Sequence, residues 1–390
     1  MLEEFLLKIG FSEEQIQMIQ RIYPKRMYSE STLSYNMKTL YHYFKRNTLD
    51  NQDFIQIIMT IPNILSSSIE NIKLKIKSIQ QLGFSKLNTF EILKKYPYLL
   101  ELNTQKIKNT MDHLEEIGFM KDTIIPIIIK YPPILGMDFS SFQKQKDFFM
   151  QYGYSKKDTL TILEQVPSLF DENTKTLSSS LEKYKKMGFH KTEILKITTI
   201  LPTLFYDKNS SLEEKWKVFR EFGYSEMDII QMIKKVPILL KEKYLEDLEE
   251  KLDYLLSFNF SKEDIIFMTC NNPYIFLYSQ ETLQIKYQGL SSLLKKQTNM
   301  VLFKNPILFG YGYQNMEEKI AFYQKIKLSP SLLEETSILT ISLDSIKARY
   351  HFMKKKLQEE DFFLTDSLFC KKYQITKKDL EQEEQNGYFN

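Results

Sequence analysis

The spacing of glycine and proline constrains this chain more than any other feature of its sequence. Five glycines follow one another at intervals of 35 residues, at Gly83, Gly118, Gly153, Gly188 and Gly223. Prolines keep the same interval at Pro62, Pro97, Pro132, Pro167, Pro202 and Pro237, and two more follow at nearly the same spacing, Pro273 and Pro306. A fixed period of this length is the signature of a solenoid, in which each unit packs on its neighbours. The segment from Gly10 to Pro24 repeats the same internal spacing, which gives about nine copies.

Each marked position of the repeat has a physical role. Glycine suits the left-handed turn that ends a helix, and Asn259 tolerates the same backbone in the copy before Pro273. An aromatic residue comes next, and proline ends the following helix because it lacks an amide hydrogen and restricts the residue before it. Between them stand serines that we expect to cap that helix: Ser12, Ser85, Ser155, Ser225 and Ser261.

An apolar column runs through all copies, nine residues after the glycine place, and we expect it to face the core. Its members are Ile19, Ile57, Ile92, Ile127, Ile162, Ile197, Met232, Met268 and Val301. Aliphatic or aromatic pairs after each proline predict a short buried turn. A second helix follows, with apolar residues at helical spacing, as in Ile107, Met111 and Leu114. We expect helices of about 12 to 15 residues, which need stacking to be stable.

The sequence therefore predicts an all-α solenoid of 35-residue repeats over residues 1–350. In the ninth copy Ser292 occupies the glycine place, and a tenth copy has Ile341 where proline belongs, which suits a terminal cap. Over residues 351–390 the period is gone, and we expect a C-terminal cap and a polar tail that is partly disordered.

Composition and charge exclude several classes of protein. Cys270 and Cys370 are the two cysteines, so a disulfide framework is excluded. No apolar stretch is long enough to span a membrane. The N-terminus is neither a secretory signal nor a transit peptide, so we expect the chain to stay in the cytoplasm, or in an organelle if a leader is missing. Net charge is +3, from 53 basic and 50 acidic residues, which neither establishes nor excludes a phosphate-binding surface.

Three segments carry a resemblance to a known family: LGFSKLNTFEILKKYPYLL (82–100), MGFHKTEILKITTILPTLF (187–205) and FGYSEMDIIQMIKKVPILL (222–240). They resemble the repeat of the mTERF (mitochondrial transcription termination factor) family, and the likeness extends over about residues 6–340. It implies two helices and a short 3₁₀ turn per repeat, curving into a superhelix. It also implies a non-catalytic scaffold that binds double-stranded DNA or structured RNA in a concave groove, with roles in transcription termination or regulation and RNA handling.

Lysines recur on the expected second helices, 25 to 29 residues after the glycine place. In one interpretation, stacked repeats align these lysines in a row that can follow a phosphate backbone. In the other, the lysines only form a solvent-exposed helix face. Arg220 and Trp216 stand one helical turn apart near Lys215 and Lys217, and this group is the one that most suggests a binding site. The alternative is that Trp216 only packs in the core. The candidate nucleic-acid-binding residues are Lys75, Lys108, Lys144, Lys146, Lys215, Lys217, Arg220 and Lys286.

A second lysine series stands two residues before proline, and we expect it to stabilise helix C-termini rather than to bind a ligand. Its members are Lys95, Lys130, Lys235 and Lys304.

No catalytic motif occurs, and we expect no enzyme activity, no metal and no cofactor. The chain has only five arginines, and lysine lacks the planar fork that reads bases. Three functions therefore stay open: electrostatic, weakly selective binding of nucleic acid, a protein–protein interaction solenoid, or the regulatory subunit of an enzyme whose chemistry lies in another chain. We expect a monomer and no membrane partner.

Overall fold

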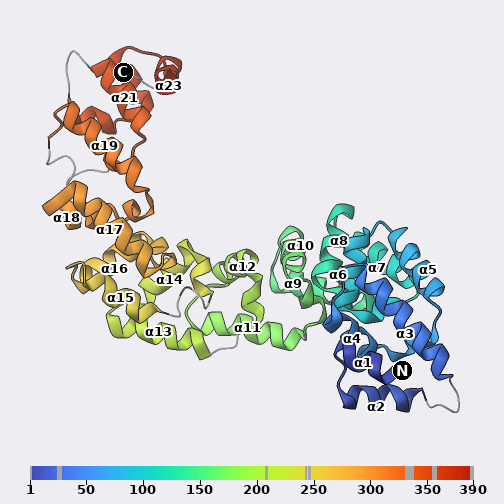
Figure 1. Cartoon of the computed structure of the whole chain (residues 1–390). Helices are drawn as coiled ribbons and strands as arrows, with labels where there is room; N and C mark the ends of the chain where they lie inside the picture. Colours follow the sequence, from blue (N-terminus) through green and yellow to red (C-terminus); the bar gives the residue numbers. More distant parts are fainter. Residues whose placement is uncertain are drawn as a thin grey trace. The chain divides into compact units, whose positions relative to one another are not determined.

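The computed structural model describes residues 2–23, 29–206, 210–241, 244, 247–329, 338–353 and 358–386. Across these ranges it consists of helices and turns without a strand (Figure 1), so the all-α prediction is confirmed. Contacts group the chain into two compact units. Unit 1 comprises Met1–Lys185 and Ile194–Phe205, and unit 2 comprises Lys186–Glu193 and Tyr206–Asn390. Pro24 lies outside the described residues.

Every copy has a first helix and a second helix, and in the eight copies from Pro62 to Pro306 a 3₁₀ turn starts at the repeat proline. The first helices are α2 (Glu13–Ile22), α4 (Asn51–Thr60), α6 (Lys86–Lys95), α8 (Lys121–Lys130), α10 (Lys156–Gln165), α12 (Lys191–Ile200), α14 (Glu226–Lys235), α16 (Lys262–Asn271) and α18 (Thr298–Lys304). The turns are η1 (Pro62–Ser66), η2 (Pro97–Leu100), η3 (Pro132–Gly136), η4 (Pro167–Asp171), η5 (Pro202–Tyr206), η6 (Pro237–Leu240), η8 (Pro273–Leu277) and η10 (Pro306–Gly310).

The second helices follow these turns, and α1 precedes the first copy. They are α3 (Glu30–Lys45), α5 (Ile69–Gln80), α7 (Thr104–Ile117), α9 (Phe139–Tyr152), α11 (Thr174–Lys186), α13 (Ser210–Phe222), α15 (Leu248–Leu256), α17 (Gln280–Leu294) and α19 (Tyr313–Lys325), with α1 at Leu2–Ile9. Within each unit, first helices stack on first helices and second helices on second helices. Examples are α6 on α8 and α7 on α9 in unit 1, and α14 on α16 and α17 on α19 in unit 2.

The boundaries of the first helices follow from the repeat residues. All five predicted serines are N-caps whose hydroxyl accepts a backbone amide hydrogen: Ser12, Ser85, Ser155, Ser225 and Ser261. At the other end, the residue before proline leaves the helix, as Tyr96 does with φ −143° and ψ 79°. Its amide still donates to the carbonyl oxygen of Ile92, the core residue four positions earlier.

The apolar column forms the centre of the core, as predicted. Its nine members are at most 4 % exposed. The first helices are shorter than expected, however: α2 through α16 have ten residues each and α18 has seven. The reason is that proline ends each helix and the cap residue, serine in five copies, marks its start, whereas the apolar pattern alone does not show where the helix stops.

The ninth copy differs from its expected form. Helix α17 continues past Ser292 to Leu294, and the left-handed residue is Lys295, with φ 54°. The assignment of Ser292 to the glycine place is therefore wrong by three residues. Because the 3₁₀ segment η9 (Lys295–Gln297) occupies what would be the first turn of α18, that helix is correspondingly short.

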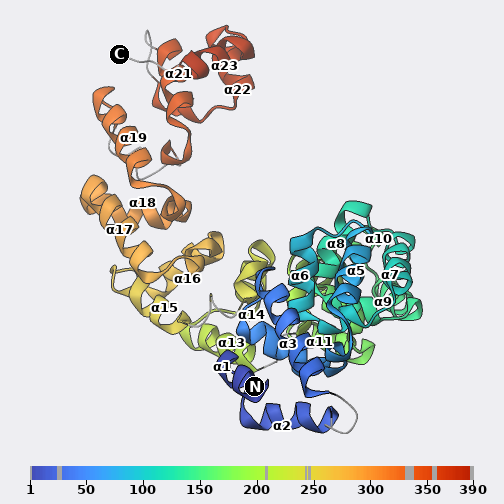
Figure 2. The same ribbon diagram turned by 45° about the vertical axis from the view of Figure 1, so that its right-hand side comes forward.

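The C-terminal part is folded where the structure describes it. After η11 (Ile338–Thr340) come α21 (Leu343–Met353), η12 (Glu359–Phe363), α22 (Asp366–Tyr373) and α23 (Lys377–Asn386). Figure 2 shows α21, α22 and α23 gathered together, and α23 contacts both other helices. Over 358–386 the chain is largely helical, and Phe362, Phe369 and Leu380 supply a small apolar core. The expected boundary at residue 350 falls inside α21.

Candidate nucleic-acid interface

Two of the candidate lysines reach forward to the next copy of the repeat. On α5, the Lys75 ammonium donates to the Leu102 carbonyl oxygen, and on α17 Lys286 donates to the Tyr311 carbonyl oxygen at 3.2 Å. Each acceptor lies at the end of the next 3₁₀ turn. Burial lowers the pKa of both lysines, since it disfavours the charged form. These two side chains therefore have a structural role between repeats.

The same role recurs with other side chains in this column, which lies thirteen residues after proline. Ser180 Oγ lies 3.0 Å from the Phe205 carbonyl oxygen, and Lys319 Nζ lies 2.8 Å from that of Leu339. Gln145 donates in the same way to the Glu172 carbonyl oxygen. These residues are of different types and share only a hydrogen-bond donor, so a search for recurring lysines did not reveal the column. The constant distance of thirteen residues from proline could have revealed it.

Three other candidates in unit 1 are available to a ligand. Lys108 on α7 and Lys144 on α9 are exposed, and Lys146 on α9 is half-buried. None of the three forms an ion pair with a described residue. The two helices are neighbours in the second-helix layer. The three lysines stand at different distances from their prolines, so they do not form a single column, and Lys144 and Lys146 leave α9 about 200° apart.

The group around Trp216 in unit 2 combines packing with charge. Trp216 is 4 % exposed and its ring lies edge-on to Phe189, with 6.1 Å between centroids. Its indole nitrogen donates to Glu226 at 2.7 Å, and Arg220 pairs with the same carboxylate at 3.2 Å. The tryptophan is therefore a packing residue here.

The outer members of this group are partly paired as well. Lys217 is exposed and lies 3.5 Å from Glu221. A pocket of about 410 Å³ opens beside Arg220, between α13 and α14. The side chain of Lys215 lies outside the described part of the structure.

The lysines before proline bind the next first helix. Lys95 donates to the Ile129 carbonyl oxygen at 3.2 Å, Lys130 to that of Glu164 at 3.1 Å, and Lys235 to that of Cys270 at 2.7 Å. Each acceptor is one of the last carbonyl groups of a helix, which have no partner within it. Three of the four lysines thus bind a helix C-terminus, which belongs to the following copy and not to their own helix, whereas Lys304 has no such bond to a described residue.

The described residues offer little for covalent chemistry. They contain no group of three His, Cys, Asp or Glu side chains placed to hold a metal ion. Burial raises the pKa of the Cys270 thiol to about 12, so it stays protonated and is a poor nucleophile at neutral pH. Among the same residues, no helix combines the length and the apolar character that a bilayer span requires.

The comparison with protein families agrees with the repeat architecture. The mTERF family model matches residues 4–241 and 171–341, which together include all the copies. The chain belongs to the mTERF family. Membership suggests nucleic-acid binding and a part in transcription termination or its regulation, and mTERF proteins are generally non-catalytic. No curated protein matches the chain.

Proposed function

We propose that this mTERF protein is a non-catalytic scaffold that grips double-stranded DNA or structured RNA through lysine–phosphate contacts on the second-helix layer. The observation that carries the proposal is that Lys108, Lys144 and Lys146, on the neighbouring helices α7 and α9, have no ion-pair partner among the described residues. Unpaired ammonium groups can each neutralise one phosphate and release its counterion.

Lys217 and Arg220 on α13 extend the proposal to unit 2, where their carboxylate partners are exposed. Glu221 and Glu226 pair with them at 3.5 and 3.2 Å, and all four side chains are more than half exposed. Such pairs contribute little stability, so a phosphate can replace the carboxylate at small cost. Lys75 and Lys286 are the weakest candidates, since their ammonium groups already bind carbonyl oxygens.

The test is affinity for duplex DNA and for hairpin RNA as a function of salt concentration. Phosphate contacts give a straight line of log affinity against log salt, with a slope of about −0.9 per contact on DNA. Replacing Lys108, Lys144 and Lys146 together by glutamine is expected to weaken binding to all sequences alike. The loss of two to three phosphate contacts is also expected to make the slope less negative by about 2 to 3 units.

A matched control removes the same charge from another surface of unit 1. Lys86, Lys121 and Lys156 are exposed at the starts of first helices, and their replacement by glutamine is expected to leave the slope within about 0.5 units. Equal effects of the two triple variants would show that net charge alone binds the nucleic acid. Undetectable binding at low salt would refute the proposal.

One observation favours a protein–protein interaction solenoid instead. Two of the lysines in the predicted row, Lys75 and Lys286, are used within the fold, and with them part of the expected positive surface. In this case the unmodified chain would not bind duplexes at low salt. It would instead co-purify with a protein partner, and variants without Lys108, Lys144 and Lys146 would still bind that partner.

A further inference from the structure

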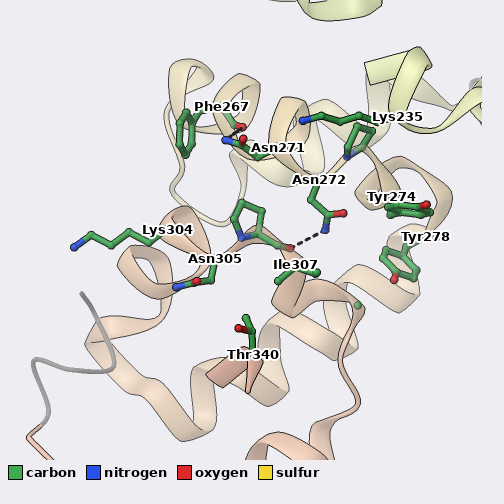
Figure 3. A pocket seen from close by; sticks show the side chains of 13 residues that line it. Lys235, Phe267, Asn271, Asn272, Tyr274, Tyr278, Lys304, Asn305, Ile307 and Thr340 are labelled. Atoms are coloured by element: carbon green, nitrogen blue, oxygen red, sulfur yellow. Dashed lines mark hydrogen bonds between the residues drawn. The ribbon is translucent and has the colours of Figure 1, made fainter. Parts of the chain in front are cut away.

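A pocket of about 800 Å³ lies on unit 2, where the first helices end. It opens where α14, α16 and α18 end and the turns η8 and η10 begin (Figure 3). Its volume is in the range of pockets that bind small molecules. The lining residues that matter here are Lys235, Phe267, Asn271, Tyr274, Lys304 and Ile307.

The repeat places three polar groups of the pocket in register. Lys235, Asn271 and Lys304 each stand two residues before the proline of three consecutive copies. Their helices are direct neighbours in the stack, α14 on α16 and α16 on α18. The pocket is therefore a hollow in the outer surface of three repeats, and its polar groups have fixed spacing.

The charge of the lining is positive, because none of its thirteen residues is acidic. Lys235 donates one N–H to the Cys270 carbonyl oxygen at 2.7 Å and has two further donors for a ligand. Lys304 has no hydrogen bond or ion pair to a described residue, and in Figure 3 it extends outward from the rim. Both lysines line the pocket, so Lys235 and Lys304 give its mouth a positive charge that favours an anion.

Aromatic faces adjoin these cations. Tyr274 is 52 % exposed and has no ring contact or hydrogen bond with a described residue. Phe267 is 47 % exposed and stacks on Phe303 with 4.8 Å between centroids. Exposed rings of this size bind planar ligands by stacking.

The amide groups of the pocket restrict which atoms a ligand can present. Asn271 Nδ2 donates to the Phe267 carbonyl oxygen at 3.0 Å, so the Asn271 amide oxygen is left to accept a hydrogen bond. Asn272 Nδ2 is used within the fold, where it donates to the Pro306 carbonyl oxygen at 2.9 Å (Figure 3). A ring with an N–H or amino group suits the accepting oxygen of Asn271.

We propose that this pocket binds a nucleotide, with its phosphate at Lys235 and Lys304 and its base against Tyr274. Cations, exposed rings and a hydrogen-bond acceptor are the complement of an anion that carries a planar base. The nucleotide is either free or part of a single strand. None of the second-helix lysines lines the pocket, although Lys286 lies 5.0 Å from the ring of Tyr278, which does; the proposal therefore does not depend on the function proposed above.

The experiment measures binding of AMP and GMP to the full chain by calorimetry, beside a single-stranded RNA heptamer. Ribose 5-phosphate and inorganic phosphate serve as ligands without a base. Tyr274→Ala is expected to weaken nucleotide binding about tenfold, since it removes one stacking surface, whereas Tyr274→Phe keeps it. Lys235→Gln is expected to weaken binding about tenfold and to reduce its dependence on salt.

Matched controls come from equivalent positions in unit 1. Tyr98, also one residue after its proline and 45 % exposed, matches Tyr274, and Lys130 matches Lys235. Tyr98→Ala and Lys130→Gln are expected to change nucleotide affinity less than twofold. If the heptamer alone binds and shows the same variant pattern, the site is confirmed and its nucleotide belongs to a strand.

Three results overturn the proposal: no saturable binding of any nucleotide probe, equal affinity for ribose 5-phosphate and AMP, or equal effects of Tyr98→Ala and Tyr274→Ala. The affinity of the Tyr274→Ala variant for duplex DNA is measured in parallel. Because duplex binding depends on the second-helix lysines and not on the pocket, this measurement distinguishes a failure of the pocket proposal from a failure of the proposed function.

Discussion

The Tyr224 hydroxyl oxygen lies 2.6 Å from the Thr269 hydroxyl oxygen in the core between neighbouring repeats. Tyr154 and Thr198, which also belong to successive copies, form the same kind of pair, with 2.6 Å between their hydroxyl oxygens. Where phenylalanine follows the glycine, the residue 44 positions later is aliphatic and buried: Phe84 with Ile128, Phe119 with Leu163, and Phe189 with Ile233. A buried hydroxyl is thus matched by a second hydroxyl in the next copy.

The two hydroxyls are not equivalent, and this predicts an asymmetric double-mutant cycle. Thr269 donates to the Ile265 carbonyl oxygen at 2.7 Å, so it accepts from Tyr224, and burial raises the pKa of that tyrosine. Thr269→Val leaves the tyrosine hydrogen without an acceptor and is expected to cost about 1–3 kcal/mol. Tyr224→Phe is expected to cost less, and the double variant less than Thr269→Val alone. Denaturant unfolding measures all three, and simple additivity would contradict the pairing.

Gly118 is predicted to resist substitution. Its φ is +125°, and an added Cβ would meet Leu160 Cδ1 at 3.2 Å and Lys156 Cε at 3.1 Å. Gly118→Ala is expected to cost about 1–3 kcal/mol because of backbone strain. Gly312, with φ −76° and no atom near a built Cβ, is the control, and Gly312→Ala is expected to change the unfolding free energy by less than about 0.5 kcal/mol. Similar losses at both positions would refute the role of the left-handed backbone.

The ion pair between Glu193 and Lys234 predicts a pH-dependent contribution to stability. The two groups lie 2.7 Å apart, and the hydrogen bond from Lys234 holds the pKa of Glu193 below its ordinary value. The pair therefore stabilises the fold above the ordinary carboxyl pKa, and the effect is lost as pH falls through the lowered pKa. Lys234→Gln is expected to cost about 0.5–1 kcal/mol at pH 7 and much less at pH 3.

The same unfolding measurements on Lys217→Gln serve as the control for this pair. Lys217 and Glu221 are 3.5 Å apart and both more than 60 % exposed, so the loss at pH 7 is expected to be smaller. A Lys234→Gln loss that is unchanged between pH 7 and pH 3 would exclude the ionised carboxylate as its cause.

Arg349 is predicted to hold the C-terminal helices together. Its guanidinium donates to the Phe362 and Leu364 carbonyl oxygens at 2.8 and 2.6 Å and to Asp366 at 2.6 Å. Lysine cannot serve three separated acceptors, so Arg349→Lys is expected to speed hydrogen exchange across 358–386 several-fold and to leave α14 and α16 unchanged. Lys325→Arg on the exposed face of α19 is the control, and fast exchange in both variants would refute the prediction.

Much of the fold could be predicted because the repeat marks its helix ends with residues of special backbone properties. Proline fixes φ and lacks an amide hydrogen, and glycine adopts the positive φ that other residues avoid, so their spacing gives helix ends directly, and Ser225 or Ser261 marks the next start. The prediction was wrong where those residues are absent. Ser292 carries no such restriction, so the left-handed turn moved to Lys295, and the tail beyond residue 351 has no repeat from which its helices could be inferred.

The candidate site was less predictable, since lysine has two uses that look alike in a sequence. Lys75 and Lys144 stand on equivalent helices, but their distances from the preceding proline differ by one residue. The Lys75 ammonium binds a carbonyl oxygen, whereas Lys144 is exposed to solvent. One residue is about 100° around a helix, so only a phase measured from proline separates these environments. Lysine–phosphate contact at Lys108, Lys144, Lys146, Lys217 and Arg220 stays a prediction.

The direction of the contacts between copies has a consequence for how the protein is made. Lys235, Lys286 and Ser180 all find their acceptors 25 to 35 residues later in the chain. Because synthesis proceeds from the N-terminus, a copy that has just left the ribosome still lacks the carbonyl groups that its donors require. Its folding is completed only when the following copy emerges, so assembly trails translation by one repeat.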